Sequence, residues 1–199
     1  MTYSFFKRFF DLCFACILFL LFFPFLIFIS FLIFIDLGWP VLFIQRRTGK
    51  NLSCFKLIKF RTMRSSLPQD TSNEDRVRIS QLGNFLRTFS IDELPSLVNI
   101  IAGHMSFVGP RPLLTSYTSK MNNLQLARFK VKPGLTGLVQ VSGRNNLSWE
   151  QKFNLDFRYV NSISFGFDIL ILLKTVPALF NISAVNQSTG STMNSFLDS

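Results

Sequence analysis

The stretch that decides the architecture is residues 12–35, LCFACILFLLFFPFLIFISFLIFI. All 24 residues are uncharged, and only Pro24 and Ser30 are not strongly apolar. At about 1.5 Å per residue, a helix of this length reaches about 36 Å, enough to cross the hydrocarbon core of a bilayer. The run is too long for a cleavable signal peptide, and DLGWP (36–40) follows it where a small-x-small cleavage site would stand. The sequence therefore predicts a membrane segment near the N-terminus.

The charges flanking this segment bear on its topology. Lys7 and Arg8 precede the run, and three basic residues lie within 46–50. Positive charge favours the cytoplasm, so both ends favour the same side of the membrane. Pro24, at the centre, removes a helical hydrogen bond and bends the axis. Two interpretations remain open: a re-entrant helix that turns at Pro24, and an ordinary spanning helix with a proline kink.

Composition restricts the partners. The 199 residues suffice for one domain with its own core, and 21 Lys+Arg against 11 Asp+Glu give a formal charge of +10. Such a balance favours nucleic acid, anionic lipid head groups or phosphorylated substrates. Of the three cysteines, Cys13, Cys16 and Cys54, the first two lie in the apolar run. With no second cysteine pair and a single histidine, we expect these two to be apolar fillers on a helix, without a zinc or redox site.

Beyond the membrane segment, the pattern predicts an α+β fold, mainly helical with a few short strands. Strands are expected at 40–47 and 53–63, at the start of 105–114, and within a glycine-rich loop at 131–145. A polar loop is expected at 65–74. Helices are expected at 74–88, 90–102, 115–130, 148–160 and 165–180, the last too short to span and placed in the core or along the membrane surface.

Two adjacent carboxylates stand out in SIDELP (90–95). Ser90 and Glu93 match a capping box, which would place Asp92 and Glu93 in the first turn of a helix. There the partial positive charge favours ionised carboxylates, and a carboxylate beside a bound phosphate suits a metal ligand or a nucleophile on phosphorus. The alternative is that acidic residues merely stabilise the helix start.

Basic and glycine-rich segments accompany this pair. Arg87 lies five residues before Asp92, and Gly109-Pro-Arg-Pro112 holds Arg111 between two prolines that stiffen its backbone. The loops KPGLTG (132–137) and SGRN (142–145) offer backbone N–H groups to an anion. Lys56, Lys59 and Arg61 punctuate a predicted strand. Together, these segments could gather a diphosphate, its metal ion and a membrane-bound acceptor at the carboxylate pair.

Several collinear motifs over about residues 5–180 resemble the bacterial sugar transferases, and more narrowly the small monotopic polyprenol-phosphate phosphoglycosyl transferases. They are K-R-x-x-D at 7–11, the apolar segment with Pro24, KFRTM at 59–63, SIDELP at 90–95, MSFVGPRPLL at 105–114, KPGLTGLVQVSGRN at 132–145 and W-x-x-K-x-x-x-D-x-x-Y-V at 149–160.

The resemblance implies a ping-pong reaction. Asp92 would attack the β-phosphate of a UDP-sugar and release UMP, and undecaprenyl phosphate would then take the phosphosugar from the carboxylate. Glu93 would support the site near Mg²⁺, with both carboxylates as metal ligands and Glu93 helping to activate the acceptor. Arg111 is expected on the nucleotide side, with Lys59, Arg87 and Arg144 as candidates for the phosphates.

The resemblance also implies an organisation and a location. We expect a re-entrant anchor at 1–36 with a break at Pro24. A compact cytoplasmic catalytic domain with interfacial amphipathic helices should follow at 37–180, and a flexible tail at 181–199. The enzyme would sit on the cytoplasmic face of the bacterial inner membrane among lipids, without a nucleic-acid partner. A second copy of the chain and downstream glycosyltransferases are further candidate partners.

Two positions depart from the family pattern. Phe23 precedes Pro24 where the family often has serine, and His104 follows Gly103 where an acid is usual. Two other functions therefore stay open: a membrane-anchored basic module that binds nucleic acid or anionic lipid, and an inactive scaffold of the same fold. The sequence does not indicate which UDP-sugar is used.

Overall fold

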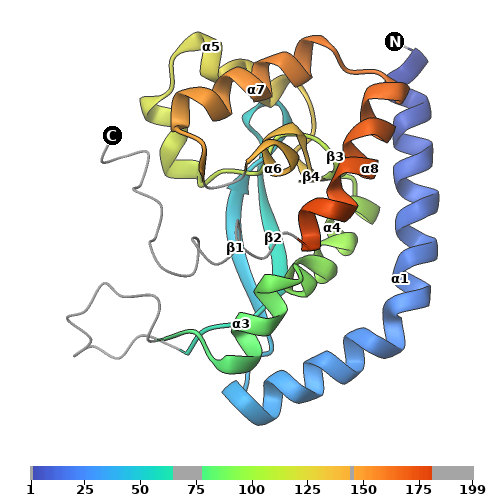
Figure 1. Ribbon diagram of the computed structural model, residues 1–199, viewed down its shortest axis with the longest axis vertical. Coiled ribbons are helices and arrows are strands. Elements are labelled where there is room, and N and C mark those ends of the chain that lie inside the picture. Colours follow the sequence, from blue (N-terminus) through green and yellow to red (C-terminus); the bar gives the residue numbers. More distant parts are fainter. Residues whose placement is uncertain (1, 65–77, 144–145, 181–199) are drawn as a thin grey trace.

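The long N-terminal helix, a central β-hairpin and a set of short helices organise the chain (Figure 1). The computed structural model describes residues 2–64, 78–143 and 146–180. Its strands are β1 (Leu42–Thr48), β2 (Cys54–Phe60), β3 (Ser106–Val108) and β4 (Gly134–Thr136). Its α-helices are α1 (Thr2–Leu37), α3 (Gln81–Thr88), α4 (Leu97–Ile101), α5 (Asn123–Leu126), α6 (Leu138–Ser142), α7 (Trp149–Asn161) and α8 (Phe165–Phe180). Short 3₁₀ helices cover Lys50–Leu52, Ile91–Ser96, Thr115–Lys120 and Ala127–Lys130. The predicted mainly helical fold with short strands is confirmed.

Helix α1 is the one helix in the described ranges that is long and apolar enough to cross a membrane. It contains Pro24, and helical structure continues through that residue. Figure 1 shows that the helix nevertheless changes direction sharply part-way along. The structure thus has a bent helix and not two helices with a break, and re-entry into a membrane remains a prediction.

Both halves of α1 pack on the rest of the protein. Before Pro24, Ala15 is buried in a cluster with Leu97 and Ile100 of α4. After Pro24, Ile33 is buried in a second cluster, against Phe60 of β2 and Leu86 of α3. The helix is therefore attached to the globular part on either side of its bend.

Polar contacts fix the two ends of α1. Asp168 of α8 accepts hydrogen bonds from Tyr3 and Lys7, at 2.6 and 2.5 Å, while Asp11 accepts the Phe107 N–H at 3.2 Å. At the other end, the Arg61 guanidinium donates to the carbonyl of Leu37. These hydrogen bonds attach α1 to α8, to β3 and to the residue that follows β2.

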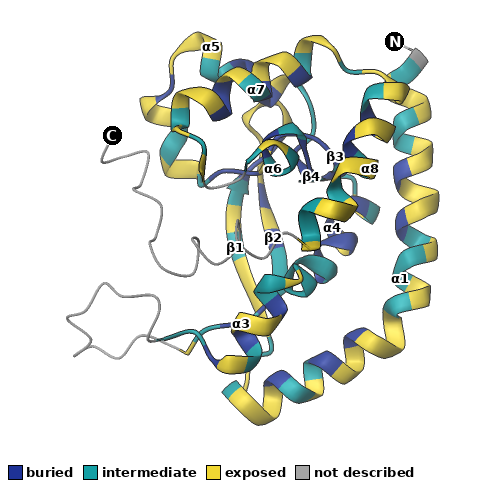
Figure 2. Ribbon diagram, viewed as in Figure 1, coloured by how far each residue is buried: buried dark blue, intermediate teal, exposed yellow. Residues whose placement is uncertain are grey.

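Much of the outer surface of α1 and α8 is apolar and exposed (Figure 2). In α8, only Asp168 and Ile171 are buried, whereas Phe165, Leu173 and Phe180 are more than half exposed. This exposure argues against a fully buried α8, and its expected position along a membrane surface stays a prediction.

The strands expected at 40–47 and 53–63 are present as β1 and β2, which pair antiparallel with Phe43 opposite Lys59. A second, parallel pair joins β3 to β4, where Gly109 and Gly134 approach so closely that a Cβ on Gly134 would lie 2.1 Å from the Gly109 nitrogen. This contact brings the glycine-rich segment beside the start of the Pro-Arg-Pro loop.

Three predicted elements need correction. In the region predicted as one helix at 74–88, Ile79 bridges to Met63 and α3 begins only at Gln81, after the Ser80 side chain caps it. The predicted surface helix 115–130 is instead divided into three short helical segments. Residues 138–142, predicted within a loop, form α6. The helix expected at 148–160 is α7, and Ser148 and Gln151 form a capping box at its start. The predicted tail 181–199 and the whole of the predicted loop 65–74 lie outside the described residues.

Candidate active site

The carboxylate pair follows a left-handed turn. Ser90 has φ of 55°, and the 3₁₀ helix Ile91–Ser96 begins directly after it. The predicted capping box at Ser90 is wrong: its side chain makes no cap, and its carbonyl accepts the Glu93 N–H at 3.2 Å. Pro95 lies inside this 3₁₀ helix and, because proline has no N–H, donates no backbone hydrogen bond there.

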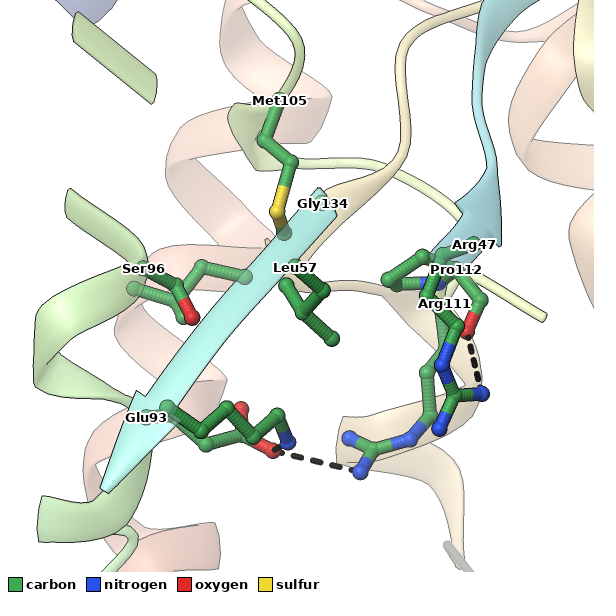
Figure 3. Close-up of a pocket in the computed structure, with 10 residues that line it drawn as sticks. Arg47, Leu57, Glu93, Ser96, Met105, Arg111, Pro112 and Gly134 are labelled. Carbon is green, nitrogen blue, oxygen red and sulfur yellow. Dashed lines mark hydrogen bonds and ion pairs between the residues drawn. The ribbon is translucent and has the colours of Figure 1, made fainter. Parts of the chain in front are cut away.

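Glu93 lies between two cations. Its Oε1 is 2.5 Å from Lys59 Nζ on β2 and 3.2 Å from Arg111 Nη2 on the Pro-Arg-Pro loop (Figure 3). Burial alone would raise the pKa of Glu93, but Lys59 and Arg111 outweigh it and lower the pKa to about 2. Glu93 is therefore anionic at neutral pH, and its Oε1 accepts from both cations.

Asp92 differs from Glu93 in its hydrogen bonds and in its pKa. Within the described part of the chain, its carboxylate accepts no direct hydrogen bond, and the cations that act on it electrostatically are Lys59, Arg87 and Arg111. Burial and the neighbouring Glu93 charge outweigh these cations and raise the pKa of Asp92 to about 6. The pKa of Asp92 is thus raised and not lowered, yet a value of about 6 still leaves this carboxylate mainly ionised at neutral pH, as expected.

The structure brings most of the predicted basic residues to this pair. Lys59 and Arg111 contact Glu93, and Arg87 of α3 is close enough to stabilise the Asp92 anion while its Nε donates to Thr62 Oγ1 at 2.8 Å. Arg144 lies outside the described residues. The pair and its cations thus come from β2, α3, the 3₁₀ helix and the Pro-Arg-Pro loop.

Arg47 was missed by the sequence analysis as a site residue. It lines the same pocket as Lys59, Glu93 and Arg111 (Figure 3). Burial and the adjacent Arg111 charge lower the pKa of Arg47 to about 10. The sequence did carry a signal for this residue. Side chains alternate between the two faces of a strand, so only one of Arg46 and Arg47 can point into the pocket.

His104, which departs from the family pattern, lies outside this pocket. Its exposed ring stacks on Phe55, with centroids 5.8 Å apart, just beyond Gly103 at φ of 84°. Its position therefore gives no reason to assign it a chemical role.

The donor set is compatible with a magnesium ion supplied with the substrate. Within the described ranges, no group of three or more His, Cys, Asp or Glu side chains could hold a metal. Mg²⁺, however, usually binds one or two carboxylates together with substrate phosphates and water. The unoccupied hydrogen-bonding capacity of Asp92 suits that mode, while Glu93 is already committed to two cations.

Comparison with known proteins identifies the family. The model for bacterial sugar transferases matches residues 2–182. The chain belongs to the bacterial sugar transferase family. It is 40% identical over 196 residues to the uncharacterized sugar transferase EpsL of Bacillus subtilis, covering 97% of this chain and 96% of the relative. The predicted family and the predicted class of enzyme, a phosphoglycosyl transferase, are confirmed.

Two further relatives have names that state a reaction. The UDP-glucose:undecaprenyl-phosphate glucose-1-phosphate transferase of Caulobacter vibrioides is 37% identical over 186 residues, covering 87% of this chain and 69% of the relative. The Escherichia coli protein of the same name is 36% identical over 183 residues, covering 85% of this chain but only 39% of the relative. Sugar transferases of this family thus include longer proteins that match this chain over part of their length.

Proposed function

We propose that the protein transfers a phosphosugar from a UDP-sugar to undecaprenyl phosphate through a covalent intermediate on Asp92. The observation that carries the proposal is the asymmetry of the pair: Glu93 is bound by Lys59 and Arg111, whereas Asp92 retains uncommitted carboxylate oxygens. The relatives named for this reaction support the choice of substrates.

Two displacements at phosphorus complete the reaction. An Asp92 oxygen forms a bond to the β-phosphorus as the bond from that phosphorus to the bridging oxygen breaks, and UMP leaves with the bridging oxygen. A phosphate oxygen of undecaprenyl phosphate then attacks the same phosphorus, the bond to Asp92 breaks, and the carboxylate is restored. When the acceptor enters as a dianion and UMP leaves as one, no net proton is taken up or released.

Because the reaction involves no net proton transfer, it does not require Glu93 as a proton acceptor. A carboxylate whose pKa is lowered to about 2 is a poor proton acceptor at neutral pH. Glu93 instead holds the Lys59 ammonium and the Arg111 guanidinium at the mouth of the site, where both can stabilise charge that develops on transferring phosphoryl oxygens. Activation of the acceptor by Glu93 is therefore not part of the proposed mechanism.

The other predicted residues fit auxiliary roles. Arg87 lowers the pKa of Asp92 and so favours the nucleophilic anion, and Arg144 is proposed as a further phosphate ligand from its sequence motif. Asp92, with Glu93 beside it, would hold Mg²⁺. The ion would neutralise charge on the diphosphate, which is the usual contribution of a magnesium ion to phosphoryl transfer.

We further propose a monotopic arrangement on the cytoplasmic face of the inner membrane. A straight helix across the bilayer would carry one end away from the domain, yet residues before and after Pro24 both pack on it. The exposed apolar side chains of the bent α1 and of α8 would then enter one leaflet, which places the carboxylate pair within reach of a lipid-linked acceptor.

UMP release tests the reaction. Purified full-length protein in detergent, given a panel of UDP-sugars, Mg²⁺ and undecaprenyl phosphate, should release UMP with at least one sugar. Asp92→Asn is the matched inactive control. Absence of release with every sugar in the panel would contradict the proposal, and an inactive scaffold would give that result.

A further inference from the structure

The backbone that carries Arg111 is held at three consecutive carbonyl groups. Arg128 Nη2 donates to the carbonyl of Arg111 at 2.6 Å, and Arg47 Nη1 donates to that of Pro112 at 3.2 Å. The backbone N–H of Thr48 donates to the carbonyl of Leu113 at 3.0 Å. The loop is therefore fixed by polar contacts from other segments, in addition to the stiffness of its own prolines.

Arg128 reaches this loop from a buried ion pair. Its Nη2 lies 3.0 Å from Asp156 Oδ2 on α7, and the two side chains are each only 4% exposed. The guanidinium also lies 5.6 Å from the ring centroid of Phe153 and 5.7 Å from that of Phe129. Burying two charges is costly, and a well-packed apolar pair of similar volume would often stabilise a fold equally well. The bond from Arg128 to the Arg111 carbonyl is what an apolar pair could not supply.

Arg111 itself combines a fixed backbone with an accessible head group. Its side chain is 52% exposed, and its Nη2 is 3.2 Å from Glu93 Oε1. A guanidinium binds phosphate through a planar fork, so its usefulness depends on its orientation as well as its charge. With the backbone restrained, only the side-chain freedom of Arg111 remains to be lost when its head group binds an anion.

We propose that Arg128, held in place by Asp156, is a positioning residue that aims Arg111 at the diphosphate of the nucleotide sugar. This inference rests on the proposed function only in taking a nucleotide diphosphate as the ligand of Arg111. Neither Arg128 nor Asp156 touches the substrate. Their effect on the reaction passes through the loop.

A double-mutant cycle tests the connection. In full-length protein, Arg128→Lys should weaken UDP binding and raise KM for the UDP-sugar by about fivefold, with a smaller change in kcat. In an Arg111→Lys background, the same substitution should change UDP binding by less than about twofold, because the fork that it would misorient is absent. Equal effects of Arg128→Lys in both backgrounds would overturn the inference.

Fold-preserving variants separate positioning from stability. The double variant Arg128→Met with Asp156→Leu keeps the volume apolar and should retain the thermal unfolding temperature, yet still weaken UDP binding. If that variant bound UDP like the original protein, the pair would be purely structural and the proposal would be wrong. Arg158→Lys, on the exposed face of α7, is the matched control and should leave binding unchanged.

The binding measurement also distinguishes the two proposals. Calorimetric titration with UDP requires no turnover, so coupling between Arg128 and Arg111 can be measured whether or not UMP is released. Coupling without UMP release from any UDP-sugar would leave the positioning role intact and refute the transferase reaction. UMP release without coupling would support the transferase reaction and refute the positioning role.

Discussion

Lys59 Nζ lies 2.5 Å from Glu93 Oε1, so the carboxylate that follows Asp92 in the chain is neutralised from the neighbouring strand. This ion pair lowers the pKa of Glu93, while Asp92, beside the Glu93 charge and partly buried, has its pKa raised. Adjacent carboxylates thus acquire different chemistry. Glu93 binds two cations, whereas the Asp92 carboxylate accepts no direct hydrogen bond from the described residues.

The pH dependence of the first half-reaction should report the ionisation of Asp92. With a pKa of about 6, the nucleophilic anion is scarce at pH 5 and predominant at pH 7.5, so the rate of UMP release without acceptor should rise across that window. Glu93→Gln removes the neighbouring negative charge and should move the midpoint to lower pH. A single-turnover assay of UMP at several pH values measures both. A midpoint that does not respond to Glu93→Gln would contradict the assigned coupling.

The same shifts affect stability in opposite directions. The pKa of Asp92 is raised in the folded state, so its contribution is fully present below its unfolded value near 3.8 and is lost as the pH rises through about 6. Glu93, whose pKa is lowered from 4.5, contributes stability above that value and loses it as the pH falls toward 2. Asp92 should therefore lower the free energy of unfolding of the original protein between pH 5 and pH 7.5. Asp92→Asn removes this loss, so the free energy of unfolding of the variant minus that of the original protein should be larger at pH 7.5 than at pH 5.

Asp92→Asn should also abolish the covalent adduct. The substitution preserves size but removes the anionic nucleophile, so both turnover and the phosphosugar mass on the Asp92 peptide should disappear. Glu93→Gln should slow turnover yet leave a detectable adduct, since Asp92 keeps its carboxylate. Mass spectrometry after incubation with UDP-sugar and Mg²⁺, without undecaprenyl phosphate, checks both. An adduct on any other residue would exclude Asp92 as the nucleophile.

Arg111→Lys keeps the charge but loses the planar fork. We expect at least about a tenfold loss in kcat/KM for the UDP-sugar, consistent with one charge-assisted hydrogen bond of about 1.5–3 kcal/mol. Steady-state UMP release measures the loss, and Lys130→Arg at an exposed site is a control for basic-residue exchange. A lysine at position 111 that performs as well as arginine would show that fork geometry is not needed.

Residue patterns predicted the elements whose signal is local. They are the long apolar run, the strands β1 and β2, and α7, and all of them depend on residue periodicity along one segment. The misplaced start of α3 and the missed α6 depend on partners far along the chain, such as the bridge from Ile79 to Met63.

The site residues also divide into those that sequence motifs indicate and those that depend on contacts between distant segments. Family motifs indicated Lys59, Arg87 and Arg111, which lie around the carboxylate pair. The links from Arg47 and Arg128 to the loop were not predictable from spacing, because each joins segments that only the folded chain brings together. The raised pKa of Asp92 likewise depends on burial, which a position at a helix start does not reveal.

The close approach of β3 and β4 should make Gly134 intolerant of a side chain. A Cβ there would lie 2.1 Å from the Gly109 nitrogen and 2.3 Å from the Thr136 carbonyl oxygen, both backbone atoms that cannot rotate away. Gly134→Ala should lower the free energy of unfolding by about 1–3 kcal/mol or more. Gly166→Ala in α8 meets nothing within 4 Å and should raise it slightly. Thermal or denaturant unfolding in detergent compares the two, and similar effects would contradict the packing described.

The bend in α1 predicts where its two ends can be labelled. Ser4 is polar and exposed near one end, and Lys50 is exposed beyond the other. Single cysteines at these positions, in a background lacking Cys13, Cys16 and Cys54, should both react with an impermeant maleimide only when it reaches the cytoplasmic side. Pro24→Ala restores a helical N–H and should straighten α1, so a fraction of molecules should expose position 4 to the periplasm. Periplasmic labelling of position 4 with Pro24 intact would mean that α1 spans the membrane. In that case its first half could not pack on α4 as the buried Ala15 requires.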